Sequence, residues 1–418
     1  MKTITEAKKE QNIKVKSLNI VDLVDRLNSP NVKNLLKKCY QCARCSGVCQ
    51  LSKVQKFTPS RIIQKILEGF ESEVLKSGIL WDCLMCNSCL QNCPEDINFA
   101  DIVRIAKNIM IQQHHHDADN YTSHKGIYLS ISQLMSTPEI TPKRNLDWIP
   151  KDCKISDKGE ILYHVGCLPF FKFEFDDLDS IAISTIKMLS MIEKNPVVVL
   201  KDEYCCGHDL YWGHGNTKAF VDLALKNKNN FKRAGISTIL TTCAEGYRTF
   251  KVDYPKIIEG FNEKYRVKHI IEYIHEKWKE GIIVFQSDDN EKENGSFTFH
   301  DPCRLSRFLP KDDKIMEMAR DIFNELKKIG FKFREMAHNK KDALCCGIGS
   351  WSGCNERSKA LRYKRLLEAK EVASKMITTC PKCIMHFRCL QKDYEDIASV
   401  KVLDFTEFII KLVILKEV

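Results

Sequence analysis

The pattern of apolar and polar positions divides the chain into a helical first part and a second part in which strands and helices alternate. In the first part, Pro59–Phe70 and Ile97–Ile111 carry apolar residues at helical spacing. In the second part, short β-branched runs alternate with longer amphipathic segments: the runs are Ile161–Val165, Val197–Leu200 and Ser237–Thr241, and the segments are Asp179–Ile192 and Asn216–Lys232. This alternation predicts α/β units with parallel strands.

The second part also contains an internal repeat. Three cysteine-bearing segments return in the same order 136 to 140 residues later; they end at Cys167 and Cys303, at Cys205-Cys206-Gly207 and Cys345-Cys346-Gly347, and at Cys243 and Cys380. Each segment follows a predicted strand directly, and open α/β sheets place ligands at the carboxyl ends of their strands. Each repeat is therefore predicted to gather its cysteines around one point.

Length and these patterns together predict several domains, since 418 residues exceed what one hydrophobic core commonly supports. We expect a polar lead-in, a mainly helical module, a linker and two α/β repeats, over residues 1–35, 36–112, 113–158, 159–280 and 295–418. The lead-in has one amphipathic stretch at Ile20–Leu27, and the linker contains His114–His116, which we expect to be solvated.

The composition is that of an ordinary water-soluble protein, with 44% hydrophobic and 29% charged residues. Apolar stretches such as Phe405–Leu415 are interrupted by charges and are shorter than the roughly 20 residues that span a bilayer. Met1–Lys16 is polar and lysine-rich, without the apolar core of a signal peptide. We expect a cytoplasmic protein that meets a membrane only through a partner.

The net charge of +10 comes from lysines spread along the chain. The sequence has no arginine-rich arm and no basic run interleaved with aromatic residues, so we do not expect it to bind nucleic acid. Two interpretations of the charge remain, a solvated lysine surface and a basic face that docks an acidic electron donor.

Cysteine is the most informative residue type, because 17 of the 20 cysteines fall into four spaced groups. A disulfide framework is not expected without a secretory signal, since the cytosol keeps thiols reduced. The grouped cysteines therefore indicate metal binding. The remaining three, Cys153, Cys354 and Cys389, are interpreted as small buried apolar side chains.

The first two groups have the spacing of a two-cluster ferredoxin, C-x₂-C-x₂-C-x₃-C, in which three cysteines bind one cubane and the fourth binds the other. We assign one [4Fe–4S] cluster to Cys39, Cys42, Cys45 and Cys93, and the second to Cys83, Cys86, Cys89 and Cys49. A pair of structural Cys₄ zinc sites is the alternative, but it does not explain two runs that complete each other. Pro94 follows the second run, whereas Gln50 stands at that place in the first.

The other two groups lie in the repeats and differ by one ligand. Repeat 2 offers five thiolates, one more than a cubane needs, which predicts a distorted or opened cluster on Cys303, Cys345, Cys346, Cys380 and Cys383. Repeat 1 has Gly246 at the fifth position and offers only Cys167, Cys205, Cys206 and Cys243. Repeat 1 could hold a four-ligand cluster, a zinc ion, or an incomplete cluster with an open iron.

A histidine precedes the first cysteine of each repeat, His164 in repeat 1 and His300 in repeat 2. A packing or hydrogen-bonding role is the first interpretation. The second is a proton donor to a departing thiolate.

The duplicated pattern Cys…Cys-Cys-Gly…Cys-x-x-Cys behind a ferredoxin module resembles the cysteine-rich (CCG) domains of heterodisulfide reductases. Cys39–Cys42 and Trp81–Cys83 resemble the C subunit of that enzyme, the rest resembles the B subunit, and the fused order resembles the D subunit. The resemblance covers roughly residues 35 to 410. The iron–sulfur subunits of glycolate, lactate and glycerol-3-phosphate dehydrogenases are also similar.

The resemblance implies that each five-cysteine set holds a noncubane [4Fe–4S] cluster and that a small-molecule disulfide is split between the two sets. The five cysteines of repeat 2 would then be catalytic. It also implies redox partners, which are a flavin-containing A-type subunit, a membrane cytochrome b or a flavoprotein dehydrogenase. The other function consistent with the sequence is a relay that carries electrons from such a dehydrogenase to a quinone or membrane carrier. The full set in repeat 2 favours the reductase, and Gly246 favours the relay.

Overall fold

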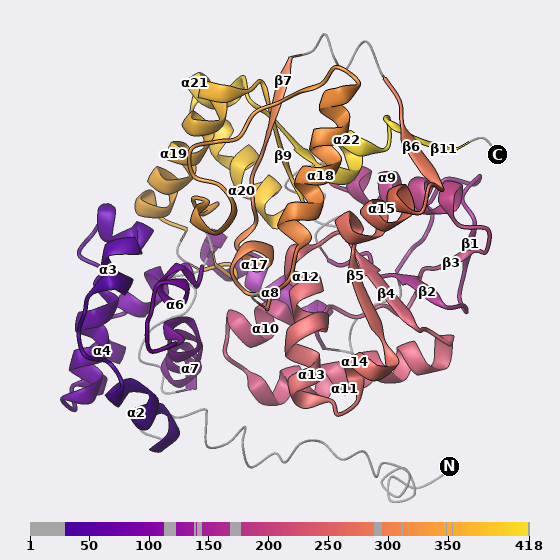
Figure 1. Ribbon diagram of the computed structural model, residues 1–418. Coiled ribbons are helices and arrows are strands. Elements are labelled where there is room, and N and C mark those ends of the chain that lie inside the picture. The colour runs from indigo at the N-terminus through magenta and orange to yellow at the C-terminus, as the bar shows by residue number, and fades with distance from the viewer. Residues whose placement is uncertain are drawn as a thin grey trace, which may run out of the picture.

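The computed structural model describes residues 30–112, 123–137, 139, 144–167, 177–287, 295–310, 312–347, 349–352 and 354–416. The amphipathic stretch predicted at 20–27 and the histidines at 114–116 lie outside these residues. A mainly helical module and two parallel sheets account for most of the described chain (Figure 1). The predicted combination of a helical first part with α/β units is confirmed at this level.

The first module consists of short helices joined by the cysteine loops, and Figure 1 shows it in indigo and purple at one side of the molecule. Its elements are α2 (Pro30–Lys37), α3 (Arg44–Val48), η1 (Gln50–Lys53), α4 (Pro59–Leu67), α5 (Glu71–Lys76), η2 (Ile79–Asp82), α6 (Ser88–Gln91) and α7 (Phe99–Gln112). Helix α4 begins with a proline, whose fixed φ suits a first turn, and buries its apolar face. The two predicted helices thus correspond to α4 and α7.

Part of the predicted linker is folded. It contains η4 (Ser123–Gly126), α8 (Ile127–Met135) and the short strand β1 (Ile155–Ser156). Tyr128 of α8 stacks on Trp351 with ring centroids 4.6 Å apart, and the Trp351 indole donates a hydrogen bond to Ser132. Helix α8 therefore packs against repeat 2.

Repeat 1 is built on a five-stranded parallel sheet of order β1-β3-β2-β4-β5. The other strands are β2 (Ile161–Tyr163), β3 (Val197–Val198), β4 (Thr238–Thr241) and β5 (Arg266–His269). The helices are α9 (Asp179–Ile192), α10 (His208–Trp212), α11 (Thr217–Ala234), α12 (Ala244–Arg248), a π-helical turn (Thr249–Asp253), α13 (Tyr254–Ile257), α14 (Phe261–Lys264) and α15 (Ile270–Lys279).

Repeat 2 has a four-stranded parallel sheet of order β10-β9-β7-β8. The strands are β7 (Ser296–Phe299), β8 (Lys332–Phe333), β9 (Lys375–Thr378) and β10 (Lys401–Asp404). The helices are α17 (Cys303–Ser306), α18 (Ile315–Lys328), η7 (Lys340–Asp342), α19 (Glu356–Val372), α20 (Pro381–Gln391), α21 (Glu395–Ala398) and α22 (Phe405–Ile409). Matched in chain order, β2-β3-β4-β5 and β7-β8-β9-β10 have the same neighbours, so the sequence repeat is also a repeat of topology.

The two repeats pack in a reciprocal way. Helix α15, which ends repeat 1, contacts α18 of repeat 2, and α22, which ends repeat 2, contacts α9 of repeat 1. A small antiparallel pair between β6 (Ile283–Phe285) and β11 (Val413–Leu415) adds a further connection, which the strand pattern did not predict. Because each repeat contacts its counterpart with the same elements, equivalent residues of the two repeats can meet.

Candidate metal centres

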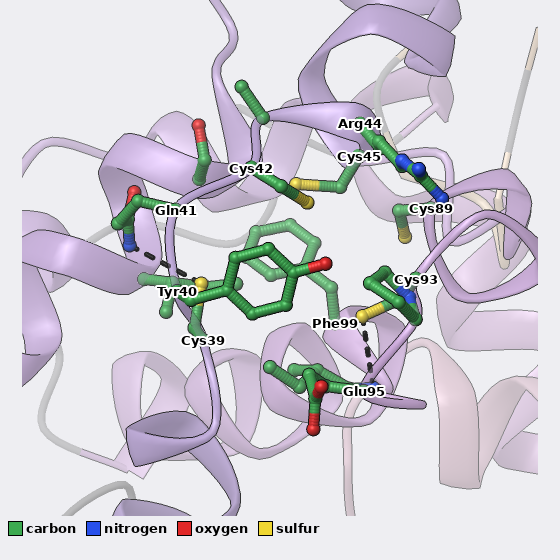
Figure 2. Close-up of a pocket in the computed structure, with 15 residues that line it drawn as sticks. Cys39, Tyr40, Gln41, Cys42, Arg44, Cys45, Cys89, Cys93, Glu95 and Phe99 are labelled. Carbon is green, nitrogen blue, oxygen red and sulfur yellow. Dashed lines mark hydrogen bonds between the residues drawn. The ribbon is translucent and has the colours of Figure 1, made fainter.

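The first ferredoxin loop and two cysteines of the second run, Cys89 and Cys93, surround a common pocket (Figure 2). The four sulfurs predicted for the first cluster all line it: Cys39, Cys42, Cys45 and Cys93. Cys42 is exposed, so this pocket opens at the surface. The backbone amide of Ile97 donates to the Cys93 sulfur over 3.4 Å, and such N–H groups are the kind that stabilise a thiolate ligand.

A second, more enclosed pocket collects Cys49, Cys83, Cys86 and Cys89. Burial raises the pKa of the Cys83 thiol to about 12 even with Lys107 nearby, so without a metal ion this thiol would stay protonated at neutral pH. Buried Lys107 lies close enough to favour the Cys83 thiolate, and its ammonium stacks over the Trp81 ring at 5.1 Å. Four cysteines facing one space, one of them buried and three partly buried, fit a metal centre, which holds thiols in their ionised form. The predicted exchange of fourth ligands matches both pockets, although ligation itself stays a prediction.

The five cysteines of repeat 2 come from the three connections that follow β7, β8 and β9, and η7 separates β8 from Cys345, which the sequence had predicted to follow its strand directly. Cys303 begins α17, Cys345 and Cys346 form a turn with Gly347, and Cys380 and Cys383 enclose the start of α20. Hydrogen bonds from Cys345 and Cys383 hold the pKa of Cys346 well below its usual range. Hydrogen bonds link Cys345 to Cys346, Cys346 to Cys383 and Cys383 to Cys380. Burial raises the pKa of the Cys303 thiol to about 12, and this thiol lies near both Cys346 of its own set and Cys86 of the second ferredoxin pocket.

Gly347 is required at the Cys-Cys-Gly turn of repeat 2. Its φ is +81°, and an added Cβ would lie 2.5 Å from the carbonyl oxygen of Ser358. Any other residue would be strained by both its backbone conformation and its neighbours. The turn that presents the two adjacent cysteines is therefore fixed by glycine.

The four cysteines of repeat 1 line a single pocket, which also includes His164, His208, Asp209, Glu245, Gly246 and Pro381. Hydrogen bonds from Cys167 and Cys206 hold the pKa of Cys205 well below its usual range. Gly246 has ordinary space around its missing Cβ, with Thr241 Oγ1 at 3.5 Å and Cys243 Cβ at 3.7 Å. A cysteine side chain would therefore have room to start at position 246, so crowding does not explain why repeat 1 lacks the fifth thiolate.

The two cysteine sets meet. The thiol of Cys243 in repeat 1 hydrogen-bonds with that of Cys380 in repeat 2, and Pro381 reaches the repeat 1 pocket. The His269 ring nitrogen Nε2 contacts Thr242 O at 3.1 Å and Thr379 Oγ1 at 3.0 Å, so one buried imidazole touches the residue before each of these cysteines. The strand ends of both sheets therefore converge on one composite site.

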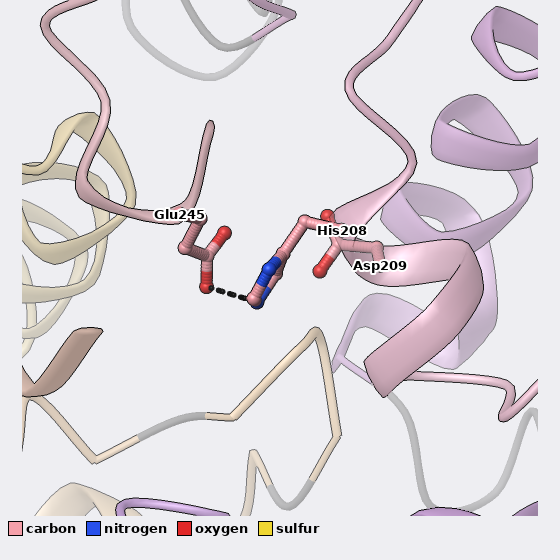
Figure 3. Close-up of side chains that lie close together, drawn as sticks. All are labelled: His208, Asp209 and Glu245. Atoms are coloured by element: carbon pink, nitrogen blue, oxygen red, sulfur yellow. Dashed lines mark ion pairs between the residues drawn. The ribbon is translucent and has the colours of Figure 1, made fainter. Parts of the chain in front are cut away.

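A buried ion cluster lies at this junction. The Lys382 ammonium is 2.7 Å from Asp209 Oδ1 and 2.6 Å from Glu245 Oε2, and Figure 3 shows the His208 ring beside Glu245. Burial raises the pKa of Asp209 to about 7 and lowers that of His208 to about 4. Sequence reasoning missed this cluster. Its signal was Glu245 and Lys382 at the same position of the two aligned motifs, with opposite charges.

Hydrogen bonds connect the second ferredoxin pocket to repeat 2. Gln50, next to Cys49, donates to Ala343 O at 3.2 Å and accepts from the Cys345 amide at 2.7 Å. Arg307 donates to Cys86 O at 2.7 Å and to Ala343 O at 3.0 Å. The residue that replaces the expected proline is therefore an interface residue.

The histidines before the first cysteines are buried within hydrogen-bond networks. His164 Nε2 contacts Tyr204 O at 3.2 Å, and His300 Nδ1 accepts from Arg365 at 3.1 Å. Burial lowers the pKa of His300 to about 3, so it is neutral at physiological pH. These contacts agree with the hydrogen-bonding interpretation.

The three cysteines outside the sets, Cys153, Cys354 and Cys389, are partly buried, and none lines either ferredoxin pocket or the repeat 1 pocket. Along the described ranges, no helix combines the length and apolar character needed to cross a bilayer.

Comparison with known families agrees with these sites. A cysteine-rich domain matches residues 161–251 and again 297–388, and a 4Fe-4S dicluster domain matches residues 35–97. The chain is therefore an iron–sulfur protein of the oxidoreductase type, with a two-cluster ferredoxin module ahead of two cysteine-rich CCG domains.

Among curated proteins it is similar to the D subunit of dihydromethanophenazine:CoB–CoM heterodisulfide reductase from Methanosarcina acetivorans, with 26% identity over 79% of this chain and 76% of that protein. This similarity places it with the iron–sulfur proteins that resemble this D subunit. It is also similar to EtfAB:quinone oxidoreductase of Syntrophomonas wolfei, 25% identical over 81% of this chain and 47% of that protein. The B subunit of fumarate reductase (CoM/CoB) from Methanothermobacter marburgensis is 24% identical over 90% of this chain and 72% of that protein.

Proposed function

We propose that the chain carries electrons from a redox partner through its two ferredoxin clusters to the joined cysteine sets, where a small-molecule disulfide is reduced to two thiols. The observation that carries this proposal is the contact between Cys243 and Cys380, which joins the two sets into one site. Cleaving a disulfide consumes two electrons and two protons and yields two thiols. Clusters transfer electrons singly, so two adjacent sites that each handle one sulfur suit this reaction.

The order of the pockets supports the direction of flow. The exposed pocket with Cys42 is accessible to a partner, the enclosed pocket with Cys49 comes next, and Gln50 connects it to the Cys345 turn. The ligands of the two [4Fe–4S] clusters are those assigned from the spacing, and the five cysteines of repeat 2 hold the catalytic, noncubane cluster. A flavin-containing subunit, a membrane cytochrome b or a flavoprotein dehydrogenase would supply the electrons.

The test is to mix half-reduced, anaerobically purified protein with a single thiol at a time. A reductase should give a paramagnetic state that broadens when the iron is ⁵⁷Fe. Cys383→Ser should abolish this state and leave the ferredoxin signals intact, whereas Cys153→Ser, outside every set, should leave both unchanged. If no thiol or disulfide perturbs any signal, the reductase assignment is wrong.

A relay is the second candidate, and two observations favour it. Gly246 removes one thiolate from repeat 1, and 81% of the chain aligns with EtfAB:quinone oxidoreductase. A relay would accept electrons from a flavoprotein dehydrogenase and pass them to a quinone or membrane carrier, while thiols would leave its spectra unchanged. Reduction of the ferredoxin clusters by such a dehydrogenase, without any thiol response, would establish this alternative.

A further inference from the structure

Repeat 1 lacks a cysteine that repeat 2 has, and it has a histidine that repeat 2 lacks. Gly246 takes the position of Cys383, while His208 directly follows the Cys-Cys-Gly turn, where repeat 2 has Ile348. Both differences fall on the same pocket, which His208 lines together with the four cysteines of repeat 1. The side chain of His208 is only 2% exposed, so its polar atoms need partners inside the protein.

The hydrogen bonds around His208 assign its tautomer. The Thr249 hydroxyl has one proton and donates it to the carbonyl oxygen of Glu245 over 2.8 Å. Thr249 Oγ1 must therefore accept from His208 Nδ1, which is 3.1 Å away. The proton is on Nδ1, and Nε2 carries a lone pair. A metal-binding histidine is typically fixed in this way by a hydrogen bond from its other ring nitrogen.

Nε2 of His208 has no hydrogen-bond partner among the described residues. The charged atom beside it is Glu245 Oε1, at 3.4 Å (Figure 3). Both atoms are electron-rich and buried, and no proton lies between them in the assigned tautomer. Either a proton on Nε2 or a metal ion would bridge such a pair.

Lys382 does not bridge this pair. Its ammonium binds Asp209 Oδ1 and the other oxygen of Glu245, Oε2. Lys382, which belongs to repeat 2, therefore pairs with Oδ1 of Asp209 and with Oε2 of Glu245. The oxygen of Glu245 that lies near His208 is Oε1, and it is not the oxygen that pairs with Lys382.

We infer that His208 Nε2 is a metal ligand of repeat 1, supplying the donor that Gly246 does not, beside the thiolates of the repeat 1 set. Two ligand atoms bound at about 2.1 Å with a tetrahedral angle are about 3.4 Å apart, which equals the separation of His208 Nε2 and Glu245 Oε1. Imidazole is a good ligand for a zinc ion and for an iron of a cluster alike. This inference rests on metal binding by the repeat 1 cysteines and does not depend on disulfide reduction.

The test compares His208→Ala with the unchanged full-length protein after anaerobic reconstitution with iron, sulfide and zinc. The unchanged protein should show imidazole nitrogen together with sulfur, by X-ray absorption at the zinc edge or by hyperfine coupling to ¹⁵N-histidine if the metal is iron. His208→Ala should lose this nitrogen and bind the repeat 1 metal at least tenfold more weakly, with the ferredoxin EPR signals unchanged. His214→Ala is the matched control, since His214 is also buried but lies outside the pocket.

A rescue variant separates ligation from a structural effect. Adding Gly246→Cys to His208→Ala should restore tight binding with sulfur ligands only, because the Cβ at position 246 has ordinary space. Three results would overturn the inference: an all-sulfur metal in the unchanged protein, no metal in repeat 1, or the same metal content and spectrum in His208→Ala. A loss of thiol reactivity without these changes would bear on the proposed function alone.

Discussion

Gln50 lies between the second ferredoxin pocket and the Cys-Cys-Gly turn of repeat 2. Its backbone follows Cys49, and its side-chain oxygen accepts the Cys345 amide over 2.7 Å. The path from one predicted cluster ligand to the next thus consists of covalent bonds and one short hydrogen bond. A proline at position 50 would suit the ferredoxin turn but could not make this connection.

Replacing Gln50 with Leu should slow electron transfer into repeat 2 while leaving both ferredoxin signals in place. The Cys345 amide would be left buried without an acceptor, which costs about 1–3 kcal/mol and loosens the junction. Freeze-quench EPR after mixing with a one-electron donor measures the delay between the appearance of the ferredoxin signals and the appearance of the repeat 2 signal. Gln64→Leu is the control, because Gln64 is exposed on α4 and its side chain donates a hydrogen bond to Glu68. An unchanged delay in Gln50→Leu would show that the hydrogen bond between Gln50 and the Cys345 amide does not affect the rate of electron transfer.

Replacing Lys382 with Met should destabilise the junction of the repeats by about 3–5 kcal/mol, because Glu245 would lose the cation beside its buried charge and Asp209 would have to take up a proton. The urea midpoint of the reconstituted protein, followed by circular dichroism, measures this loss. Lys359→Met, which breaks a partly exposed pair with Asp393, should cost no more than about 1 kcal/mol. Equal effects of the two substitutions would contradict the importance of the buried cluster.

At the scale of elements, the two closing helices follow their strands with similar caps. His269 caps α15 together with Glu272, and Asp404 caps α22 together with Glu407. Because these helices pack on the opposite repeat, their caps stabilise the junction as well as the helix. Burial raises the pKa of Asp404 to about 8, with a smaller contribution from the charge of Glu407.

The Asp404 carboxyl should make stability fall as pH rises toward 8. In the folded protein it stays protonated to about pH 8, whereas an unfolded aspartate ionises near pH 4, so unfolding releases a proton between these values. The free energy of unfolding then falls by about 1.4 kcal/mol per pH unit in that window. Asp404→Asn retains the capping oxygen but cannot ionise, so its stability relative to the unchanged protein should rise from pH 6 to pH 8. Urea titrations of both proteins at each pH measure the free energy of unfolding. A difference between the two proteins that stayed constant from pH 6 to pH 8 would refute the raised pKa of Asp404.

At the scale of the whole molecule, the pockets form a series from the surface to the interior. The pocket with exposed Cys42 comes first, the one with Cys49 second, and the joined sets of the repeats last. Each neighbouring pair shares a residue or a direct contact. This arrangement favours electron transfer along one path.

Anaerobically purified protein should contain at least three [4Fe–4S] clusters, or about 12 irons, two of the clusters in the ferredoxin module. The spacing predicts that the fourth ligands are exchanged, and in that case Cys93→Ser should alter the cluster in the exposed pocket and Cys49→Ser the one in the enclosed pocket. Iron analysis and EPR of the two variants distinguish these effects. Zinc with negligible iron after reconstitution, or identical spectra of the variants, would contradict the assignment.

Several features of this chain follow from local sequence. The helices at Pro59–Leu67 and Phe99–Gln112 follow from periodicity, and parallel α/β units follow from strand-helix alternation. The grouping of Cys39, Cys42 and Cys45 followed from their spacing within one short loop, and Cys93 was added from the exchange of fourth ligands in two-cluster ferredoxins. The folded part of the linker was missed, because α8 is held by Trp351 of repeat 2 rather than by its own pattern.

The sequence by itself determined the class of chemistry, because thiolates at these spacings bind metals wherever the loops lie. It also determined that the two repeats are unequal, since Gly246 offers no ligand. Only the tertiary structure decided that Cys243 meets Cys380, that Lys382 pairs with both Asp209 and Glu245, and that Gln50 reaches Cys345. These contacts join residues far apart in the chain, and the reciprocal packing of the repeats fixes them, which no local pattern records.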